Sequence, residues 1–517
     1  MSASYLMGID IGSTSIKAVI YDLGGNLVAS GGSPTVLSHL DREHPQWASW
    51  EPEKIWGGVS SAIKEALGKA GDPKAVKAVA VTGFGCDGLP IDKNGEWLYP
   101  FISWYCPRTQ PQRDAWVEKL GAGKIFSITG RLLWPFDSIY RIMWMKENQP
   151  GILEKTYKWV LIEDFVNFML CGAVATDYSM ASCTSVLDLK ARNWSDELIG
   201  HAGVRKDLFP EIKQSGTYLG QVSKKASELT GLSTDTAVVL GGHDYHCAAI
   251  PAGLFDEEVL LDVGGTWEMV LAASGKPKLD KSVFEAGIAV EAHVARDCYT
   301  IMGAEVSGSM LEWLKDTYAY EEAETAKKTG GSVWGYMMDK AAQSPCGSKG
   351  VFFLPHFAGR SCIAPDPKSL GAFVGLNNTV GKGDMYRAVV EGLNYQFREM
   401  LTSIEGIMNK KYGRILAVGG VTRNSFLTQN KSDITGRTIE AVDLDEATSL
   451  GAALMAGIGV GLYADEQEAF KRTFKPGRLF EPDLELTARY DKYFEIYKEL
   501  HPSLKKANSR IFDMFKA

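Results

Sequence analysis

The fold of this chain is decided by the stretch Met7-Gly-Ile-Asp10-Ile-Gly12-Ser13-Thr14-Ser15-Ile-Lys17-Ala-Val-Ile-Tyr-Asp22. Apolar residues on both sides of a short polar turn predict two strands joined as a hairpin. The turn combines a glycine with three hydroxyl side chains beside backbone N–H groups, and such a concave group of donors attracts phosphate. Asp10 would repel that phosphate unless a divalent cation lay between them, so the hairpin also predicts Mg²⁺.

A second copy of the hairpin appears later in the chain, in Asp262-Val-Gly264-Gly265-Thr266-Trp267. Its Asp, Gly and Thr each lie 252 residues after their counterparts in the first copy, and apolar strands flank it too. A single Asp-x-Gly-x-Thr hairpin also occurs in folds that bind nothing. Two copies predict two similarly folded halves that face each other across the phosphates of a nucleotide. The contacts expected from the first copy are Gly12, Ser13, Thr14, Ser15 and Lys17.

Length and charge limit the possible architectures and partners. A chain of 517 residues is too long for one core and suits two domains of about 250 residues each. We expect the first domain, with the sugar site and a phosphate hairpin, at residues 1–253 and a nucleotide-binding domain at residues 254–517. The net charge is -8 without a Lys/Arg cluster, which argues against nucleic acid or an anionic membrane as partner.

The N-terminus, the apolar runs and the cysteines bear on the cellular compartment of the protein. The N-terminus lacks the basic start and long apolar core of a signal peptide, and no apolar run reaches the length of a membrane span. Eight scattered cysteines without a Cys-x-x-Cys pair indicate reduced thiols in a cytoplasmic protein. A homodimer is compatible with the sequence, which does not determine the oligomeric state.

Two acidic residues follow apolar strands in the first half. Asp87 follows the strand predicted at residues 75–81, at the edge where open α/β sheets bind ligands, so it is a candidate substrate contact. Asp244 follows the strand predicted at residues 238–240 and is our candidate general base, because an aspartate is ionised at neutral pH and can accept a proton from a hydroxyl. The alternative is a loop or helix-capping carboxylate. His243 and His246 flank Asp244 and Tyr245, and this spacing without further ligands indicates ordinary loop or core histidines rather than a metal site.

Glycines in the second half predict the rest of a nucleotide site. Gly308 and Glu312 lie at the start of a helix, where the helix dipole favours an anion. The strand at residues 415–418 runs into Gly419 and Gly420, which would let a flat ring lie against the backbone, and Asn424 could bond the base or the ribose. A plain β-to-α turn is the alternative. Two phosphate hairpins, an implied Mg²⁺ and a free acid together predict phosphoryl transfer from ATP.

These motifs resemble the FGGY carbohydrate kinases, in the right order, from about residue 6 to about residue 500. The resemblance implies an α/β protein of two actin-like domains, each with an RNase H-type core, and a nucleotide cleft between them. It implies that Asp244 is the base and that Asp10 and Asp244 hold Mg²⁺. It further implies that Thr14, Gly265, Thr266, Gly308 and Glu312 surround the phosphates of ATP, with Gly419, Gly420 and Asn424 at the adenosine.

Within the family, residues 80–88, 92–100 and 102–109 are similar to the bacterial L-fuculokinase branch, as is Gly265-Thr-Trp-Glu268. Cys106 stands where the common pentulose kinases carry an acid. The likeness implies a small ketose as substrate, phosphorylated at a terminal hydroxyl that would be C1 for L-fuculose. The substrate contacts expected from it are Asp87, Arg108, Asp244, Trp267 and Glu268.

Three departures from the patterns of related kinases leave other activities open. Tyr245-His246-Cys247 after the base and Asp262-Val before Gly264 differ from the fuculokinase pattern. The loop at residues 355–371 lacks the Gly-Glu-Arg of the pentulose kinases but keeps Asp366-Pro367. The alternatives are kinases of another sugar or polyol, namely L-xylulose, D-xylulose, D-ribulose or erythritol. A non-catalytic, nucleotide-binding actin-like module is the alternative from a different class. For single substrate residues, structural roles compete with contact: Arg108 could support a loop and Trp267 could belong to the core.

Overall fold

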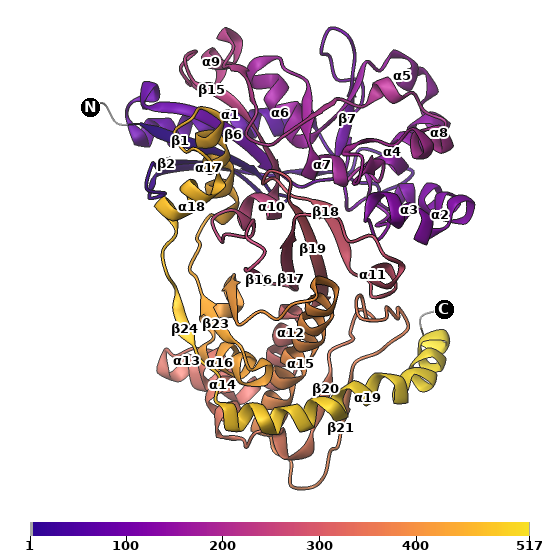
Figure 1. Ribbon diagram of the computed structural model, residues 1–517, viewed down its shortest axis with the longest axis vertical. Coiled ribbons are helices and arrows are strands. Elements are labelled where there is room, and N and C mark those ends of the chain that lie inside the picture. The colour runs from indigo at the N-terminus through magenta and orange to yellow at the C-terminus, as the bar shows by residue number, and fades with distance from the viewer. Residues whose placement is uncertain (1–3, 516–517) are drawn as a thin grey trace.

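Two β-sheets with the same internal strand order organise the chain. The computed structural model describes residues 4–515, and the two sheets form the upper and lower lobes of Figure 1. Within that range, no helix combines the length and the apolar character needed to cross a bilayer.

The first sheet has six strands in the order β14-β15-β6-β1-β2-β3. Strands β1 to β3 are antiparallel neighbours, whereas β6 and β15 run parallel to β1. The strands are β1 (Tyr5–Ile11), β2 (Ser15–Asp22), β3 (Leu27–Pro34), β6 (Val76–Gly83), β14 (Tyr218–Gln221) and β15 (Ala237–His243).

The second sheet repeats this plan with the order β18-β19-β17-β16-β22-β23-β24. Strands β16, β17 and β19 are antiparallel neighbours, and β22 and β23 run parallel to β16. The strands are β16 (Leu260–Gly264), β17 (Trp267–Ser274), β18 (Ala289–Ala292), β19 (Tyr299–Val306), β22 (Arg414–Val418), β23 (Thr438–Ala441) and β24 (Arg478–Phe480). Three antiparallel strands followed by two parallel ones, twice in one chain, confirm the predicted pair of actin-like α/β cores.

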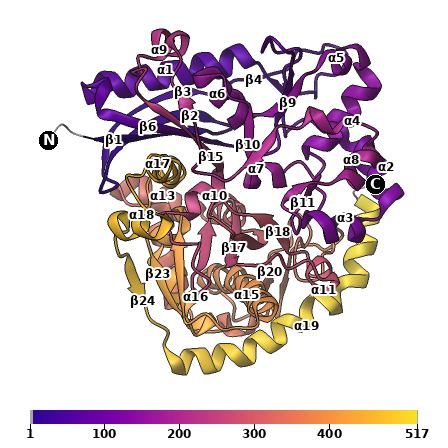
Figure 2. The same cartoon turned by 45° about the horizontal axis from the view of Figure 1, so that its top comes forward.

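Each lobe carries its own helices and short accessory strands. The helices of residues 1–253 are α1 (Pro52–Ala70), α2 (Gln110–Leu120), α3 (Ala122–Thr129), α4 (Ser138–Asn148), α5 (Pro150–Lys155), α6 (Ile162–Cys171), α7 (Tyr178–Ser182), α8 (Asp196–Ala202), α9 (Lys224–Thr230) and α10 (Asp244–Ala249). The later helices are α11 (Lys281–Glu285), α12 (Gly308–Tyr318), α13 (Tyr320–Thr329), α14 (Val333–Gln343), α15 (Lys382–Met408), α16 (Ser425–Thr435), α17 (Ala447–Gly459), α18 (Glu466–Thr473) and α19 (Leu484–Phe515). In Figure 2, α19 runs along the outside of the lower lobe.

The accessory strands form small sheets outside the two main ones. They are β4 (Leu37–Ser38), β5 (Ser49–Trp50) and β8 (Phe101–Ile102) in one, and the pairs β7 (Gly88–Ile91) with β9 (Lys158–Leu161), β10 (Ala175–Asp177) with β13 (Glu211–Lys213), β11 (Leu187–Asp188) with β12 (Asn193–Trp194), and β20 (Phe352–Leu354) with β21 (Ala372–Val374).

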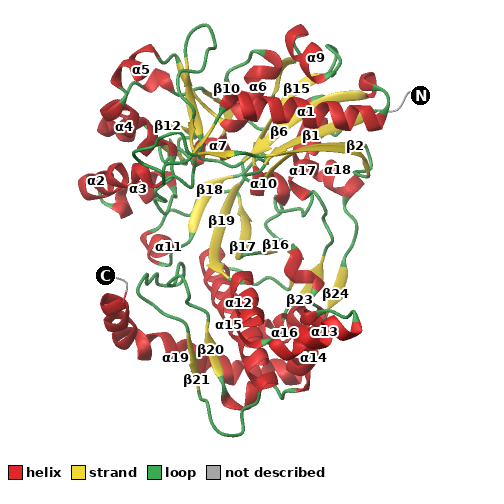
Figure 3. Ribbon diagram, turned by 180° about the vertical axis from the view of Figure 1, so that it is seen from behind, coloured by secondary structure: helices red, strands yellow, loops and turns green. Residues whose placement is uncertain are grey.

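The two faces of β1 meet different helices because successive side chains of a strand point to opposite sides. The apolar residues at positions 7, 9 and 11 belong to the large core cluster that includes the buried face of α1. Gly8 lies on the other side, against Ser449 of α17. Figure 3 shows α1 and α17 on opposite sides of this sheet. Asp10 shares the side of Gly8 and is therefore directed toward the start of α17.

The packing of α17 brings a late segment of the chain onto the first sheet. A Cβ added at Gly8 would lie 1.8 Å from the carbonyl oxygen of Ser449, and one at Gly451 would lie 1.8 Å from that of Cys247. Only glycine allows this approach of strand, helix and α10. The boundary that we propose near residue 253 therefore separates the strands of the two sheets but not the helices that cover them.

Strands β18 and β19 reach into the first lobe from the second. The backbone N–H of Val290 donates to the carbonyl oxygen of Gly130 over 3.0 Å, and the Tyr299 hydroxyl donates to that of Leu189 over 3.1 Å. These bonds tie one edge of the second sheet to the segments around α3 and β11.

Replacing Gly8 by alanine is expected to lower the free energy of unfolding by about 1–3 kcal/mol, because the methyl group overlaps the backbone of α17. Gly57→Ala is the matched control: a Cβ there meets nothing within 4 Å, and alanine in a helix should stabilise by about 0.5–1 kcal/mol. Urea denaturation of both variants measures the difference. Equal effects of the two substitutions would contradict the close contact of β1 and α17.

Candidate active site

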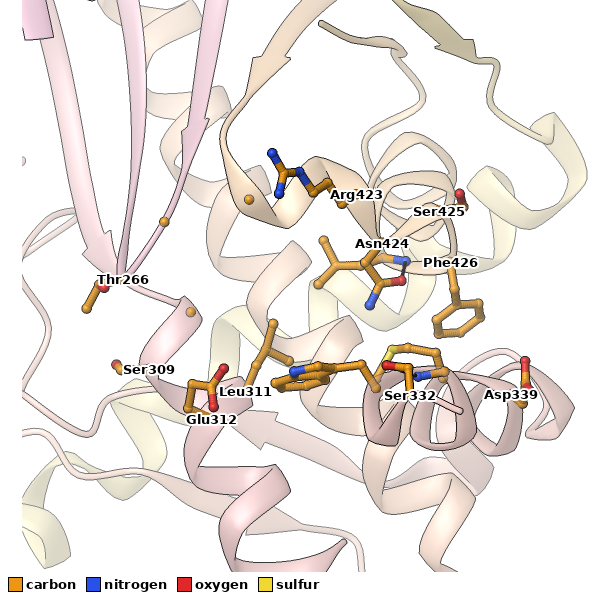
Figure 4. Close-up of a pocket in the computed structure, with 17 residues that line it drawn as sticks. Thr266, Ser309, Leu311, Glu312, Ser332, Asp339, Arg423, Asn424, Ser425 and Phe426 are labelled. Atoms are coloured by element: carbon orange, nitrogen blue, oxygen red, sulfur yellow. Dashed lines mark hydrogen bonds between the residues drawn. The ribbon is translucent and has the colours of Figure 1, made fainter. Parts of the chain in front are cut away.

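A cavity of about 940 Å³ lies in the second lobe and contains six of the predicted nucleotide residues (Figure 4). These six are Gly265, Thr266, Gly308, Glu312, Gly420 and Asn424. The cavity therefore joins residues of the second lobe that are far apart in sequence.

One end of the cavity is built from the β16–β17 turn and the start of α12. The backbone N–H of Gly308 donates to the carbonyl oxygen of Gly265 over 3.0 Å, and that of Ser307 donates to Thr266 over 3.0 Å. A Cβ at Gly308 would lie 2.3 Å from the Gly265 oxygen, so a larger residue would push the helix away from the turn. The N-terminus of α12 next to a turn rich in N–H groups suits a phosphate chain.

The other end of the cavity is more apolar. Trp334 and Met338 of α14 and Phe426 of α16 line it, and such a surface suits a flat aromatic base. Asn424 caps α16, because its Oδ1 accepts a hydrogen bond from the backbone N–H of Leu427 over 3.2 Å. The side-chain NH₂ of Asn424 is left as a donor for a ligand.

Of the two glycines after β22, only Gly420 lines the cavity. Gly419 has a positive φ of 98°, and a Cβ there would lie 2.3 Å from the carbonyl oxygen of Gly264. Gly420 lines the cavity, and a Cβ there would meet nothing within 4 Å. The first glycine thus packs against the hairpin while the second leaves open space, as expected for a backbone shelf.

The first hairpin lies in the other lobe and does not line this cavity. Its turn is closed by the N–H of Gly12, which donates to the carbonyl oxygen of Ser15 over 3.0 Å. Thr14 is exposed at the tip. Lys17 forms a 2.5 Å ion pair with Glu446, the residue that precedes α17. The turn residues stay predicted nucleotide contacts, with Lys17 already partnered by a carboxylate.

Three carboxylates influence one another at the end of β1. Burial, together with the negative charges of Asp244 and Glu446, raises the pKa of Asp10 to about 7 against the opposing effect of Lys17. The Asp10 Oδ1 atom is buried without a hydrogen-bond partner. An orphaned carboxylate oxygen beside a second carboxylate fits a hard divalent cation such as Mg²⁺, which takes one or two protein carboxylates and completes its shell with water and phosphate. Among the described residues, no group of three or more His, Cys, Asp or Glu side chains forms a closed metal cage.

Asp244 is the first residue of α10 and directly follows β15. Its Oδ1 accepts a hydrogen bond from the backbone N–H of Tyr245 over 2.6 Å and lies 2.7 Å from Nδ1 of His243. The side chain is 36% exposed. Within residues 4–515, the bonds to this carboxylate all reach Oδ1, so Oδ2 is available to a substrate.

Glu446 is a site residue that the sequence analysis missed. It adopts a left-handed conformation with φ of 57°, which is costly for a residue other than glycine and accumulates at functional sites. Its carbonyl oxygen accepts a hydrogen bond from the Tyr21 hydroxyl, which holds it beside the first hairpin. The sequence contains no local signal for this position, because the partner of Glu446, Lys17, lies 429 residues away.

Asp87 lies inside the protein rather than on a surface. Its Oδ2 accepts hydrogen bonds from Trp50 Nε1 over 2.7 Å and from the backbone N–H of Trp104 over 3.0 Å, and its Oδ1 lies 2.7 Å from Arg141. The side chain is fully buried. Asp87 thus holds the loop of Trp104, and any contact with substrate through its side chain would require these bonds to change.

Arg108 is also held by the protein. Its guanidinium lies 4.4 Å from the ring centre of Trp47, and its Nε donates to Cys106 Sγ over 2.9 Å. Three further bonds reach the Tyr99 hydroxyl, Ser49 and the carbonyl oxygen of Ala48. These contacts favour the structural alternative, in which Arg108 supports a loop, and the cysteine in place of an acid is its partner.

Trp267 and Glu268 are neighbours with opposite environments. Trp267 is 40% exposed at the start of β17, so its indole can meet a ligand, whereas Glu268 is buried. Lys431 of α16 pairs with both Glu268, at 2.5 Å, and Asp262. This buried triad, Asp262–Lys431–Glu268, joins α16 to the β16–β17 hairpin. A substrate role for Glu268 stays a prediction, with the carboxylate committed to Lys431 in this structure.

The repeated cores and the cavity define a two-lobed protein of the actin-like class. The model of the FGGY family of carbohydrate kinases, N-terminal domain, matches residues 5–251, and that of the C-terminal domain matches residues 261–460. The chain belongs to the FGGY family of carbohydrate kinases and is a sugar kinase. This confirms the resemblance inferred from the hairpins and the glycine motifs.

Individual relatives span nearly the whole chain. L-Fuculokinase of Escherichia coli K12 is 28% identical over 487 residues, which cover 94% of this chain and 98% of that protein. Xylulose kinase of Lactococcus lactis is 26% identical over 517 residues, with 99% of each chain covered. The crystal structure of gluconate kinase from Lactobacillus acidophilus has the same fold, with a TM-score of 0.88 at 24% identity over 99% of this chain and 100% of that one.

Removing the cation of the buried triad should destabilise the protein strongly. Lys431→Met leaves Asp262 and Glu268 buried without a partner, and we expect a loss of about 3–5 kcal/mol in the free energy of unfolding. Lys327→Met removes an exposed pair with Glu324 and should cost less than about 1 kcal/mol.

The decrease in the free energy of unfolding caused by Lys431→Met should depend on pH. Burial raises the pKa of Asp262 to about 7 even though Lys431 lowers it, so removing the lysine raises it further. The deficit of Lys431→Met is then largest above pH 7 and narrows toward pH 5, where protonation relieves the uncompensated charge. Urea denaturation at three pH values tests this, and a deficit that grows on acidification would contradict it.

Proposed function

We propose that this sugar kinase transfers the γ-phosphoryl group of ATP, with Mg²⁺, to the terminal C1 hydroxyl of a small ketose, and that L-fuculose or a similar sugar is the acceptor. The observation that carries the proposal is Asp244: a half-buried carboxylate with one oxygen held by its neighbours and the other free, beside the unpartnered carboxylate of Asp10. We further propose a cytoplasmic location, which the eight free cysteines support.

In this mechanism the chain positions reactants rather than forming a covalent bond with them. The cavity in the second lobe holds the adenosine and the phosphates, and the sugar lies against Asp244. As the hydroxyl oxygen attacks the γ-phosphorus, Oδ2 of Asp244 accepts its proton, and the bond between the γ-phosphorus and the bridging oxygen breaks to leave ADP. Mg²⁺ at Asp10 and Asp244 would offset the charge of the phosphates.

Two observations lead to the proposed sugar: the similarity of the chain to L-fuculokinase and the side chains that are exposed to a ligand. The L-fuculokinase relative supports a ketose, and the exposed indole of Trp267 can cover the apolar side of a sugar ring. Asp87 and Arg108 support the loop between them, which carries the stacked rings of Trp104 and Tyr105 at 3.8 Å. With Cys106 in place of an acid, this loop offers fewer charged groups, which suits a deoxy sugar.

The xylulose kinase relative supports the second candidate, a kinase of another sugar or polyol such as D-xylulose, L-xylulose, D-ribulose or erythritol. A coupled assay of ADP release with Mg-ATP against L-fuculose and these four acceptors, each with a no-sugar control, separates the candidates. L-Fuculose should give a kcat/KM well above the others. A different preferred acceptor would overturn the sugar assignment and leave the kinase chemistry intact.

Asp244→Asn should lower kcat by at least 100-fold, because it removes a general base, while the Kd for ATP stays within about twofold. Asp235→Asn is the control, since this exposed residue lies just before the opposite end of β15. Steady-state kinetics and calorimetric ATP binding provide the two readouts. Wild-type turnover of the asparagine variant would rule out Asp244 as the base.

A further inference from the structure

A carboxylate from the second lobe reaches the helix that begins with Asp244. Glu291 belongs to β18, the strand that extends from the second sheet into the first lobe. Its Oε2 accepts a hydrogen bond from the hydroxyl of Tyr245 and lies 3.3 Å from Nε2 of His246. Tyr245 and His246 are the second and third residues of α10, so Glu291 contacts two side chains of the first turn of this helix.

The carboxylate is itself fixed from the first lobe. Arg131 donates to Oε1 of Glu291 and also pairs with Asp137 at 2.5 Å. The side chains of Arg131, Asp137 and Glu291 are at most 5% exposed. A buried charged pair with several hydrogen bonds has one good geometry and little freedom to adopt another, so the Tyr245 hydroxyl is held at a defined place.

Tyr245 transmits this constraint to the catalytic carboxylate. Its backbone N–H donates to Oδ1 of Asp244 over 2.6 Å, while its hydroxyl is held by Glu291. One residue therefore connects the second-lobe strand to the orientation of Asp244, across a chain separation of 46 residues.

We propose that Glu291 is a positioning residue for phosphoryl transfer: through the Tyr245 hydroxyl and His246 it sets the orientation of Asp244 and ties it to the second lobe, which holds the nucleotide. The inference rests on the proposed function of Asp244 as base. Phosphoryl transfer needs the acceptor hydroxyl, the base and the γ-phosphate to be aligned, and a displacement of about 1 Å can lower the rate about 100-fold.

Two conservative substitutions test the proposal with a matched control. Tyr245→Phe removes only the hydroxyl, and Glu291→Gln removes only the charge. Each should lower kcat at least tenfold, with KM for ATP within about threefold of wild type. Tyr299→Phe is the control, because it removes a buried hydroxyl that also bonds across the lobes, to Leu189, without contacting α10; its kcat should stay within about twofold.

The kinetics use the sugar that the wild-type protein phosphorylates fastest among L-fuculose, D-xylulose, L-xylulose, D-ribulose and erythritol. A thermal melt of each variant accompanies them, and Tyr245→Phe keeps the test valid if Glu291→Gln fails to fold. Unchanged kcat in Tyr245→Phe, or an equal loss in Tyr299→Phe, overturns the positioning role.

A double variant separates this inference from the assignment of the base. If Glu291 acts through Asp244, adding Tyr245→Phe to Asp244→Asn should not lower the residual turnover further. A second tenfold loss in the double variant overturns the proposed route through Asp244. If Asp244→Asn alone keeps wild-type turnover, or if none of the five sugars is phosphorylated, the proposed function fails and the inference fails with it.

Discussion

The mutual repulsion of carboxylates at the meeting point of the lobes is the constraint on which this structure depends. Asp10 lies one residue before the end of β1, Asp244 begins α10 after β15, and Glu446 directly precedes α17. The charges of Asp244 and Glu446 each raise the cost of ionising Asp10. In a hydrophobic core without a function, apolar residues would be expected in place of such neighbouring carboxylates, because each buried charge loses its hydration. Here Lys17 supplies one counter-charge, and the divalent cation that we propose would supply another.

The surrounding packing holds these groups together against that repulsion. Close contact of β1, α17 and α10 depends on Gly8 and Gly451, which bring three backbones within reach. Buried ion pairs then connect the elements around the site: Lys431 joins α16 to the β16–β17 hairpin, and Arg131 pairs with Glu291 of β18, the strand that reaches α10. The backbone contacts therefore set the distances between the elements that carry the site, and the buried ion pairs hold those elements in their orientations.

The repeated cores were predictable because their signals are local: a hairpin, a strand and a glycine turn each occupy a few consecutive residues. The same holds for Gly265, Gly308 and Asn424, which meet in one cavity. Glu446 and Glu291 were not predictable, since their partners lie 429 and 46 residues away. Asp87 and Arg108 show a different limit of prediction from sequence. The sequence shows a carboxylate and a guanidinium near the ends of strands, but only the structure shows whether each side chain faces solvent or is buried and supports a loop.

The position of α17 has a consequence for the synthesis of the protein on the ribosome. The first sheet is complete once β15 has emerged, yet the helix that covers the face of Gly8 begins only at residue 447. At about 5–20 residues per second, roughly 10–40 seconds of translation separate residue 253 from that helix. During that interval the first lobe exposes an apolar sheet face, so the nascent chain is a natural client for chaperones, and slow codons in this interval would extend its exposure.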